Sequence, residues 1–236
     1  MSDLVLIIGG TSGIGLETAN YLFGKGYKVV VSGRREFKSR SINFVKSDIK
    51  SDQSVIELYN KIKNNYGDVN AIVYSAGITS KKKSIKDFDE SSFYDLINTN
   101  VTGLLRVLKH FYISLKASKG RVAVVNSIAG KRYSKISGIE YTISKAALTG
   151  LVRQLSLEWV DDGILINSVF PSMTLTPMLI DNLTIEELQE LSKKVPLNKL
   201  AETFDVARAI EFLISSENKY MTGSGIDISG GQVLSG

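Results

Sequence analysis

The strongest indication of the fold is the N-terminal sequence Leu4-Val5-Leu6-Ile7-Ile8-Gly9-Gly10-Thr11-Ser12-Gly13-Ile14-Gly15. Its first five residues form an apolar run of strand length, and apolar residues between Leu16 and Phe23 then recur at helical spacing. The glycines between them stand where a backbone must turn sharply and approach a pyrophosphate, with the helix dipole and the first-turn amides facing the phosphates. An ordinary tight turn is the alternative, but glycines placed directly between strand and helix favour a dinucleotide-binding turn.

Strand-like and helical patterns alternate along the rest of the chain. This alternation predicts right-handed crossovers and a parallel sheet covered on both faces, which is a single α/β domain of the doubly wound Rossmann type over residues 1–236. The strand-like runs lie at 4–8, 28–32, 42–46, 70–74, 121–125, 164–169 and near 226–228, and the helical patterns lie at about 14–25, 53–65, 90–117, 140–160 and 203–215.

A second motif is Tyr141-Thr142-Ile143-Ser144-Lys145. Positions four apart lie on one face of a helix, so the phenol and the ammonium are expected to point into one site. A free tyrosine has a pKa of about 10, and a cation held nearby favours the phenolate and lowers that pKa toward neutral pH. The spacing alone also fits a surface pair, and it gains weight only from the other motifs.

Together these motifs resemble the short-chain dehydrogenase/reductase family, and the 3-oxoacyl-carrier-protein reductases within it, over essentially the whole chain. The family turn Thr-Gly-x-x-x-Gly-x-Gly is matched from Ile8 to Gly15, with Ile8 in place of Thr. The family's catalytic Asn and Ser fall on Asn100 and Ser127, and Tyr141 follows Ser127 by fourteen residues. The resemblance therefore implies a catalytic set of Asn100, Ser127, Tyr141 and Lys145.

Two family motifs are altered in this sequence. Asn-Asn-Ala-Gly after the fourth strand appears as Tyr74-Ser75-Ala76-Gly77, so the bonds made by both asparagines need replacement. Pro-Gly after the sixth strand appears as Pro171-Ser172, followed by Thr174 and Thr176.

The end of the second strand favours NADP(H) over NAD(H). Gly33 stands where NAD enzymes place an acid for the ribose 2′-hydroxyl, and the next residue, Arg34, can bind a 2′-phosphate with its guanidinium. Arg35 either helps or faces water. Asp48-Ile49 matches the family's adenine-contacting pair, although Asp48 also fits a helix cap. The predicted cofactor-binding residues are Gly9, Thr11, Ser12, Gly13, Ile14, Gly15, Arg34, Asp48, Ile49, Ala76, Gly77, Tyr141, Lys145, Thr174 and Thr176.

The resemblance also implies a mechanism. Tyr141 is expected to give its proton to a carbonyl oxygen that receives a hydride from NADPH at carbon, while Ser127 hydrogen-bonds the same oxygen. Lys145 is expected to contact the nicotinamide ribose and stabilise the phenolate, and Asn100 to hold a water that links Lys145 to solvent.

The segment 172–200 is longer than an ordinary connection and rich in apolar residues. Its position after the sixth strand predicts a substrate lid with a short helix or two, and a permanently packed helix is the alternative.

Composition narrows the functional classes. The chain has 236 residues, is 43% hydrophobic and contains no cysteine, which allows one large core and excludes disulfides and thiol catalysis. Its single histidine, His110, argues against a His-based triad or metal site, and we expect it to be a partly buried helix residue. No stretch reaches membrane-spanning length, and the N-terminal run is too short for a signal peptide, so a cytoplasmic protein without membrane contact is expected.

The charge of +5 comes from basic residues scattered along the chain, which argues against nucleic-acid binding. Two basic groups, 81–83 and 131–135, should follow the carboxyl ends of strands, where they form either solvated loops or a site for an anionic substrate handle. Carrier-protein reductases commonly carry a basic residue just before the Gly that precedes the sixth strand. Here that place reads Asp161-Asp162-Gly163, with Lys116 and Lys119 as partial compensation.

The substrate is therefore expected to be a small-molecule carbonyl or alcohol, anionic or carrier-linked, with sugars and other ketones still open. A non-catalytic NADP(H)-binding sensor is the alternative from another class, and the presence of all four catalytic residues argues against it. An epimerase or dehydratase of the related longer fold would need a larger C-terminal region. The resemblance also implies a homo-oligomer, a tetramer or a dimer.

Overall fold

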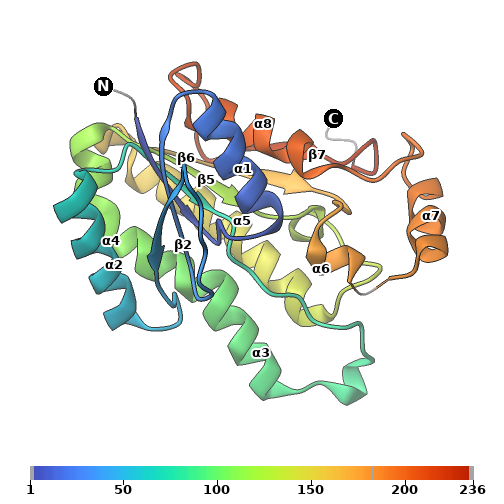
Figure 1. The fold of residues 1–236 in the computed structure, drawn as a ribbon. Helices are drawn as coiled ribbons and strands as arrows, with labels where there is room; N and C mark the ends of the chain where they lie inside the picture. Colours follow the sequence, from blue (N-terminus) through green and yellow to red (C-terminus); the bar gives the residue numbers. More distant parts are fainter. Residues whose placement is uncertain (1–2, 182, 234–236) are drawn as a thin grey trace.

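The computed structural model describes residues 3–181 and 183–233, and within these the chain forms one parallel sheet of seven strands (Figure 1). The strand order is β3-β2-β1-β4-β5-β6-β7, which confirms the doubly wound Rossmann-type fold. The strands are β1 (Leu4–Ile8), β2 (Lys28–Gly33), β3 (Asn43–Lys46), β4 (Ala71–Tyr74), β5 (Arg121–Val125), β6 (Leu165–Pro171) and β7 (Gly225–Ile228).

The central strands are buried on both faces because helices cover both sides of the sheet. In β1, Leu4, Leu6 and Ile8 belong to one core cluster, while Val5 and Ile7 belong to the other. This alternation follows from the two-residue period of a strand. The first cluster lies under α2 (Asp52–Tyr66), α4 (Gly103–Ser118) and α5 (Ile139–Glu158), and the second lies under α1 (Gly13–Gly24) and α8 (Thr203–Ile214).

The continuous helix predicted over 90–117 is wrong in its middle. The segment forms α3 (Glu90–Ile97), a π-helical turn at Asn98–Thr102, and then α4. The Tyr74 hydroxyl donates to the Thr99 carbonyl at 2.7 Å, and Gly103 leaves room for that hydroxyl, since a Cβ there would lie 2.8 Å from it. Turns of this kind are often found at functional sites, and this one contains Asn100.

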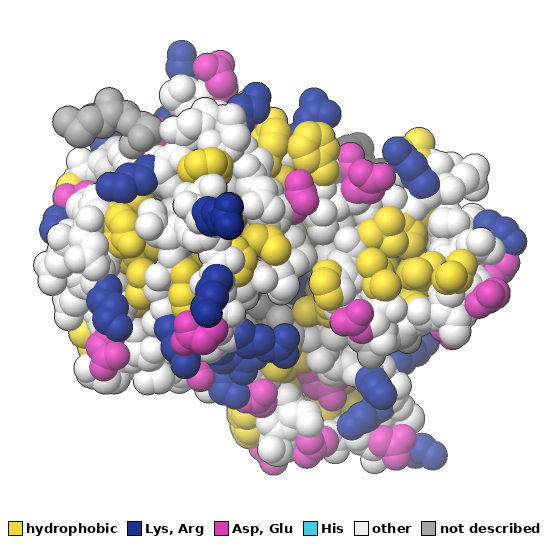
Figure 2. Space-filling view, viewed as in Figure 1, with side chains coloured by type: hydrophobic (Ala, Val, Ile, Leu, Met, Phe, Trp, Pro, Cys, Tyr) yellow, Lys and Arg dark blue, Asp and Glu magenta, His cyan; other side chains and the backbone are white. Residues whose placement is uncertain are grey.

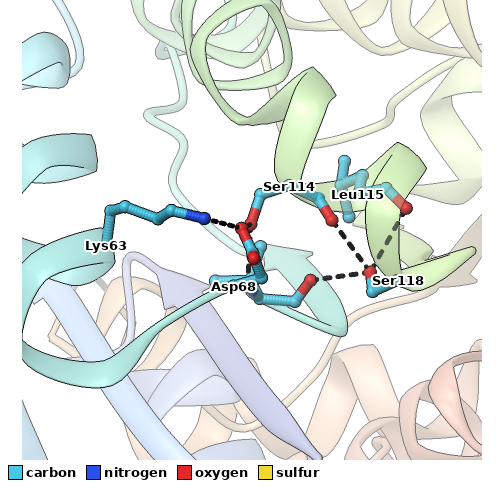
Figure 3. A network of polar contacts seen from close by, with 6 residues as sticks. Lys63, Asp68, Ser114, Leu115 and Ser118 are labelled. Carbon is cyan, nitrogen blue, oxygen red and sulfur yellow. Dashed lines mark hydrogen bonds and ion pairs between the residues drawn. The ribbon is translucent and has the colours of Figure 1, made fainter.

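A polar network lies at the amino ends of the strands, opposite the glycine turn (Figure 3). Lys63 near the end of α2 pairs with Asp68 at 2.6 Å, and the hydroxyl of Ser114 on α4 donates to Asp68 at 2.8 Å. The hydrogen bond from Lys63 is the main reason that the Asp68 pKa lies below its usual value. The network fixes α2 and α4 against the start of β4.

The predicted lid segment contains two short helices, α6 (Pro177–Ile180) and α7 (Ile185–Lys193). Thr184 and Glu187 form a capping box at the start of α7, and no residue described in either helix is buried. The segment returns to the body of the protein at a bridge between Thr174 and Ala201. Among the described residues, no helix has both the length and the apolar character that crossing a bilayer would require.

Candidate active site

The site lies where the strand order reverses. The chain leaves β1 toward one side and β4 toward the other, which opens a crevice at the carboxyl ends of these strands. The two segments approach closely there, because a Cβ on Gly9 would lie 2.6 Å from the Ala76 nitrogen. Gly9 has a φ of +81°, so a side chain is excluded by both conformation and space. Figure 2 shows a hollow near the middle of this face, with apolar side chains to its right over α6.

Tyr141 and Lys145 lie one helical turn apart on α5, as their spacing predicted. The Lys145 ammonium lies 5.6 Å from the centre of the Tyr141 ring and donates to the Val125 carbonyl at 2.9 Å. The Tyr141 hydroxyl is hydrogen-bonded to the side chain of Ser127. Three of the four predicted catalytic residues are therefore brought together at the end of β5 and the start of α5.

The electrostatics differ from the expectation that Lys145 lowers the Tyr141 pKa. Burial raises the pKa of Tyr141, and the hydrogen bond with Ser127 opposes that effect. Burial also lowers the pKa of Lys145 to about 8. The physical reason is that removing water disfavours both charged forms, while the ammonium lies toward the face of the ring and is bonded to a backbone carbonyl.

Ser127 is held in place by hydrogen bonds of Asn126, a residue that the sequence analysis did not single out. The Asn126 side chain is 3% exposed; its oxygen accepts from the Ser127 N–H at 3.0 Å, and its nitrogen donates to the Thr149 hydroxyl at 3.0 Å. Thr149 in turn donates to the Lys145 carbonyl at 3.1 Å. Asn126 thus connects Ser127 to α5. The signal in the sequence was an amide directly after an apolar strand.

Asn100 joins the site from the π-helical turn. Its side chain is fully buried; its oxygen accepts from the Ile78 N–H at 2.8 Å, and its nitrogen donates to the Ile78 carbonyl and the Ser144 hydroxyl, both at 3.0 Å. A Cβ on Gly77 would lie 3.4 Å from the Asn100 oxygen and 4.0 Å from the Lys145 nitrogen. The amide braces the loop after β4 against α5, and the water assigned to Asn100 stays a prediction.

The glycine turn fits a dinucleotide. Helix α1 begins at Gly13, whose φ is +53°. Its cap residue Ser12 makes no side-chain capping bond, so the Ser12 hydroxyl does not occupy the first-turn amides. A Cβ on Gly15 would collide with the Gly9 carbonyl. Ile14 packs against the second core cluster. The close approach of Gly15 to the Gly9 carbonyl is typical of a turn that brings backbone amides to a pyrophosphate, and binding by these residues stays a prediction.

Arg34 and Asp48 border one pocket of about 390 Å³ at the ends of β2 and β3. Arg34 is exposed, and the structure assigns it no ion pair within the described part of the chain. A Cβ on Gly33 would lie 3.2 Å from the Thr11 side chain, so Thr11 fills the space above Gly33. The pocket is lined by Arg34, Lys46, Ser47, Asp48, Ser54, Glu57 and Lys61.

The alternative role of Asp48 as a helix cap is wrong, because Ser51 caps α2 by accepting from the Ser54 N–H. The Asp48 carboxylate accepts instead from the Lys50 N–H at 3.0 Å. The Ile49 side chain belongs to the core, and its carbonyl accepts from Arg106 at 3.1 Å. The backbone N–H is therefore the group of Ile49 that is left to contact a nucleotide.

The two threonines after β6 lie differently. Thr176 immediately precedes α6 and lies beside the glycine turn, since a Cβ on Gly13 would lie 3.5 Å from its methyl group. Thr174 is 6% exposed, and its hydroxyl donates to the Ser172 carbonyl at 3.0 Å. Of the two, it is Thr176 that lies directly against the predicted phosphate turn.

His110 lies on α4, bonded to Asp52 at 2.8 Å with its side chain 16% exposed, so it is the partly buried helix residue that was expected. Over residues 3–181 and 183–233 no cluster of three or more His, Cys, Asp or Glu side chains is arranged to hold a metal ion.

Comparisons with known proteins agree with this geometry. A family profile described as Enoyl-(Acyl carrier protein) reductase matches residues 9–232. The 3-oxoacyl-[acyl-carrier-protein] reductase FabG of Haemophilus influenzae is 30% identical over 98% of this chain and 98% of its own. The acetoacetyl-CoA reductase of Shinella zoogloeoides is 30% identical over 98% of this chain and 99% of its own.

Solved structures show the same likeness. The structure of ElxO with NADP bound is 30% identical, covers 98% of both chains and has a TM-score of 0.91. The structure of a variant of actinorhodin polyketide ketoreductase with NADPH is 26% identical, covers 98% of this chain and 97% of its own, and has a TM-score of 0.90. The chain therefore belongs to the short-chain dehydrogenase/reductase family and is an oxidoreductase of that family.

Proposed function

We propose that this enzyme reduces a carbonyl to a secondary alcohol, or runs the reverse reaction, with NADP(H) as cofactor and Tyr141 as the proton donor. The observation that carries the proposal is the Tyr141 hydroxyl, bonded to Ser127 and lying one turn from Lys145 in the crevice beside the glycine turn. Bound NADPH supplies a hydride to the carbonyl carbon. The residues of the chain orient the carbonyl and deliver the proton.

Each catalytic residue has a role that its contacts support. Tyr141 is partly buried, and with its raised pKa it stays protonated at neutral pH and can donate to an oxygen that gains negative charge. Ser127 lies close enough to share that oxygen. Lys145, with its pKa near 8, places a cation beside the ring at neutral pH, and Asn100 braces the surrounding loop.

The preference for NADP(H) is supported by charge and space at the end of β2. Gly33 offers no carboxylate for a ribose hydroxyl, and the exposed Arg34 lines the neighbouring pocket. A guanidinium in that place suits a 2′-phosphate. The ElxO structure contains NADP.

The substrate class we propose is a 3-oxoacyl thioester, because two of the relatives are named for such substrates on a carrier protein or coenzyme A. Lys116, one of the lysines expected to compensate for the acidic Asp161-Asp162 place, pairs with Asp162 at 2.6 Å, and Tyr112 donates to the same carboxylate. This pairing reduces the positive charge available there to an acidic carrier protein and favours coenzyme A as the handle.

Three further features belong to the proposal. The segment 172–200 acts as a lid, which its exposed apolar residues Met178 and Ile185 support, at 50% and 70% exposed.

The enzyme acts in the cytoplasm as a homo-oligomer, a tetramer or a dimer. Exposed apolar side chains on α4 and α5 support the oligomer, namely Leu105, Ile113, Ile143 and Leu157. Light scattering of the purified protein tests it, and a monomer at micromolar concentration would contradict it.

The test of the function is an absorbance assay of NADPH and NADH consumption with 3-oxoacyl thioesters, keto-sugars and small diketones. Wild type is expected to oxidise NADPH with the thioesters, and Tyr141→Phe to lose about 10²–10⁴-fold in kcat, because only the proton donor is removed. NADPH binding, followed by its fluorescence, should be retained in the variant. A variant with a near-wild-type rate would refute the role of Tyr141, and tight NADPH binding without any turnover would favour the sensor.

A further inference from the structure

Two loops meet at the rim of the catalytic site. One is the segment 78–84 after β4, and the other is the segment 131–138 that leads into α5. Lys81 and Ser137 form an antiparallel bridge, and the Gly138 N–H donates to the Ser80 carbonyl at 3.0 Å. The Thr79 hydroxyl donates to the Ser137 hydroxyl at 3.1 Å. The two basic groups recognised in the sequence are therefore parts of one surface.

This surface carries four exposed lysines, Lys81, Lys82, Lys83 and Lys135, which we call the basic rim. The other two cations of these loops have partners: Lys131 pairs with Asp227 at 2.6 Å, and Arg132 donates to the Gln232 carbonyl and the Tyr133 hydroxyl. No ion pair is assigned to the basic rim within the part of the chain that the structure describes.

Acidic groups neutralise little of this charge. Glu140 lies at the junction of the two loops, but its side chain is 4% exposed and accepts from the Ser80 hydroxyl at 3.0 Å. Asp89 is the acid whose pKa responds to Lys83, although its bonds with Ser92 are the larger cause of its lowered pKa. The pKa of Tyr133 is lowered, first by Arg132 and then by Lys135, as expected in a positive local field.

The basic rim is continuous with the catalytic residues. Ser80 is bonded to Glu140, the residue before Tyr141, and Ile78 holds the Asn100 amide at the start of the same loop. In Figure 2, dark blue side chains lie along the lower right of the face, where Figure 1 shows the segment between β4 and α3. The cofactor phosphates are assigned elsewhere, to the glycine turn and Arg34, so the rim is free for the substrate.

We propose that the basic rim binds the phosphate of a phosphopantetheine-type handle while the thioester carbonyl reaches Tyr141. The inference rests on the proposed reduction of an acyl thioester. Exposed lysines carry flexible point charges, which suit a phosphate held loosely at the mouth of a site and raise the encounter rate of an anionic substrate. Coenzyme A and a carrier protein share this phosphate, and the experiment distinguishes them.

The experiment compares three thioesters of one acyl group, namely acetoacetyl-pantetheine, acetoacetyl-coenzyme A and an acetoacetyl carrier protein. The pantetheine thioester keeps the arm but has no phosphate. In Lys81→Gln/Lys82→Gln, the KM for the coenzyme A thioester is expected to rise about 3- to 10-fold relative to that for the pantetheine thioester, and less at high salt. Lys25→Gln/Lys109→Gln removes the same charge from the surface around α1 and α4 and is expected to leave the ratio unchanged.

The outcomes separate the handle from the reaction. A larger rise with coenzyme A than with pantetheine supports the proposal, and a comparable rise with the carrier protein shows that the shared phosphate is what is bound. Equal KM changes for the pantetheine and coenzyme A thioesters would refute phosphate binding by the basic rim, but they would not contradict the proposed reductase activity. Failure of wild type to reduce any thioester, including the neutral one, would refute the proposed function and the handle with it.

Discussion

The catalytic centre and the Arg34 pocket are built in opposite ways. Around Tyr141, nearly every polar side chain is held by the protein itself: Asn100 makes three hydrogen bonds, and Asn126 makes two. Arg34 is exposed and has no ion pair among the described residues. The centre of the proposed reaction is thus preorganised by buried bonds, whereas the proposed phosphate site offers a charge whose geometry the ligand must complete.

This contrast predicts which substitutions change binding and which change the rate. A preorganised site lowers the reorganisation needed in the transition state, so damage there should appear in kcat. An exposed cation such as Arg34 contributes equally to ground state and transition state, so its loss should appear in the KM of the cofactor. Substitutions at the two sites should therefore change different kinetic constants.

Apart from loss of the Tyr141 hydroxyl itself, the largest effect is expected for Lys145→Met. Losing the cation should lower kcat by about 10²–10³-fold, because the charge beside Tyr141 disappears. The same change should stabilise the fold at pH 7 by about 1–3 kcal/mol, since burial lowers the Lys145 pKa from 10.5 to about 8 and one pKa unit corresponds to about 1.4 kcal/mol. Denaturant unfolding and steady-state kinetics on the same preparations measure both.

The pH dependence gives this prediction its control. The unfolded chain keeps the Lys145 proton up to about pH 10.5, whereas the folded protein releases it near pH 8. The cost of the buried charge is therefore present in full below pH 8 and is relieved as the pH rises from 8 to 10.5, so wild type should gain stability relative to the variant over that window. If the difference in unfolding free energy between wild type and variant stayed constant from pH 8 to 10.5, the buried charge of Lys145 would not be the cause of that difference.

The second effect is expected for Arg34→Ala. Removing the guanidinium should raise the KM for NADPH about 10- to 100-fold and leave kcat and the KM for NADH nearly unchanged, because a charge-assisted contact with the 2′-phosphate is lost. Arg35→Ala is the matched control, since Arg35 is the adjacent exposed cation. If Arg35→Ala weakens NADPH binding as much as Arg34→Ala does, the phosphate is held by general positive charge and not by a bidentate contact with the Arg34 guanidinium.

The sequence predicted the features that depend on local pattern. The buried strand before Gly9 and the four-residue spacing of Tyr141 and Lys145 are properties of period and turn geometry, and the structure reproduces both. The π-helical turn was missed because it goes with a contact from outside 90–117, the hydrogen bond from the Tyr74 hydroxyl on β4 to the Thr99 carbonyl. The raised pKa of Tyr141 was missed because desolvation depends on the packed surroundings and not on spacing.

The third effect is expected for Asn126→Ala. The change removes the clamp between Ser127 and α5, so Ser127 loses its fixed position, and kcat should fall about 10-fold. Thr149→Val keeps the shape but removes the hydroxyl and its bonds to Asn126, Lys145 and Gly130, while the bond between Asn126 and Ser127 remains, so it should lower kcat less. The KM for NADPH distinguishes positioning from general damage: a rise in that KM together with a lower melting temperature would contradict a role confined to Ser127.

The smallest effect is expected for Tyr74→Phe, which tests how the π-helical turn is held. The Tyr74 side chain is 1% exposed, and burial raises the pKa of its hydroxyl, so it stays a donor to the Thr99 carbonyl at any working pH. Removing the hydroxyl leaves that carbonyl without its donor and should cost about 1–2 kcal/mol of unfolding free energy, measured by denaturant unfolding.

The control for this change is Tyr59→Phe on α2, where the ring packs against Phe111, and it should alter stability by less than about 0.5 kcal/mol. Asn100 has three bonds of its own to Ile78 and Ser144, so kcat of Tyr74→Phe should fall only a few-fold. A loss of kcat as large as that of Lys145→Met would mean instead that Tyr74, standing where the family has an asparagine, holds the catalytic turn in place by itself.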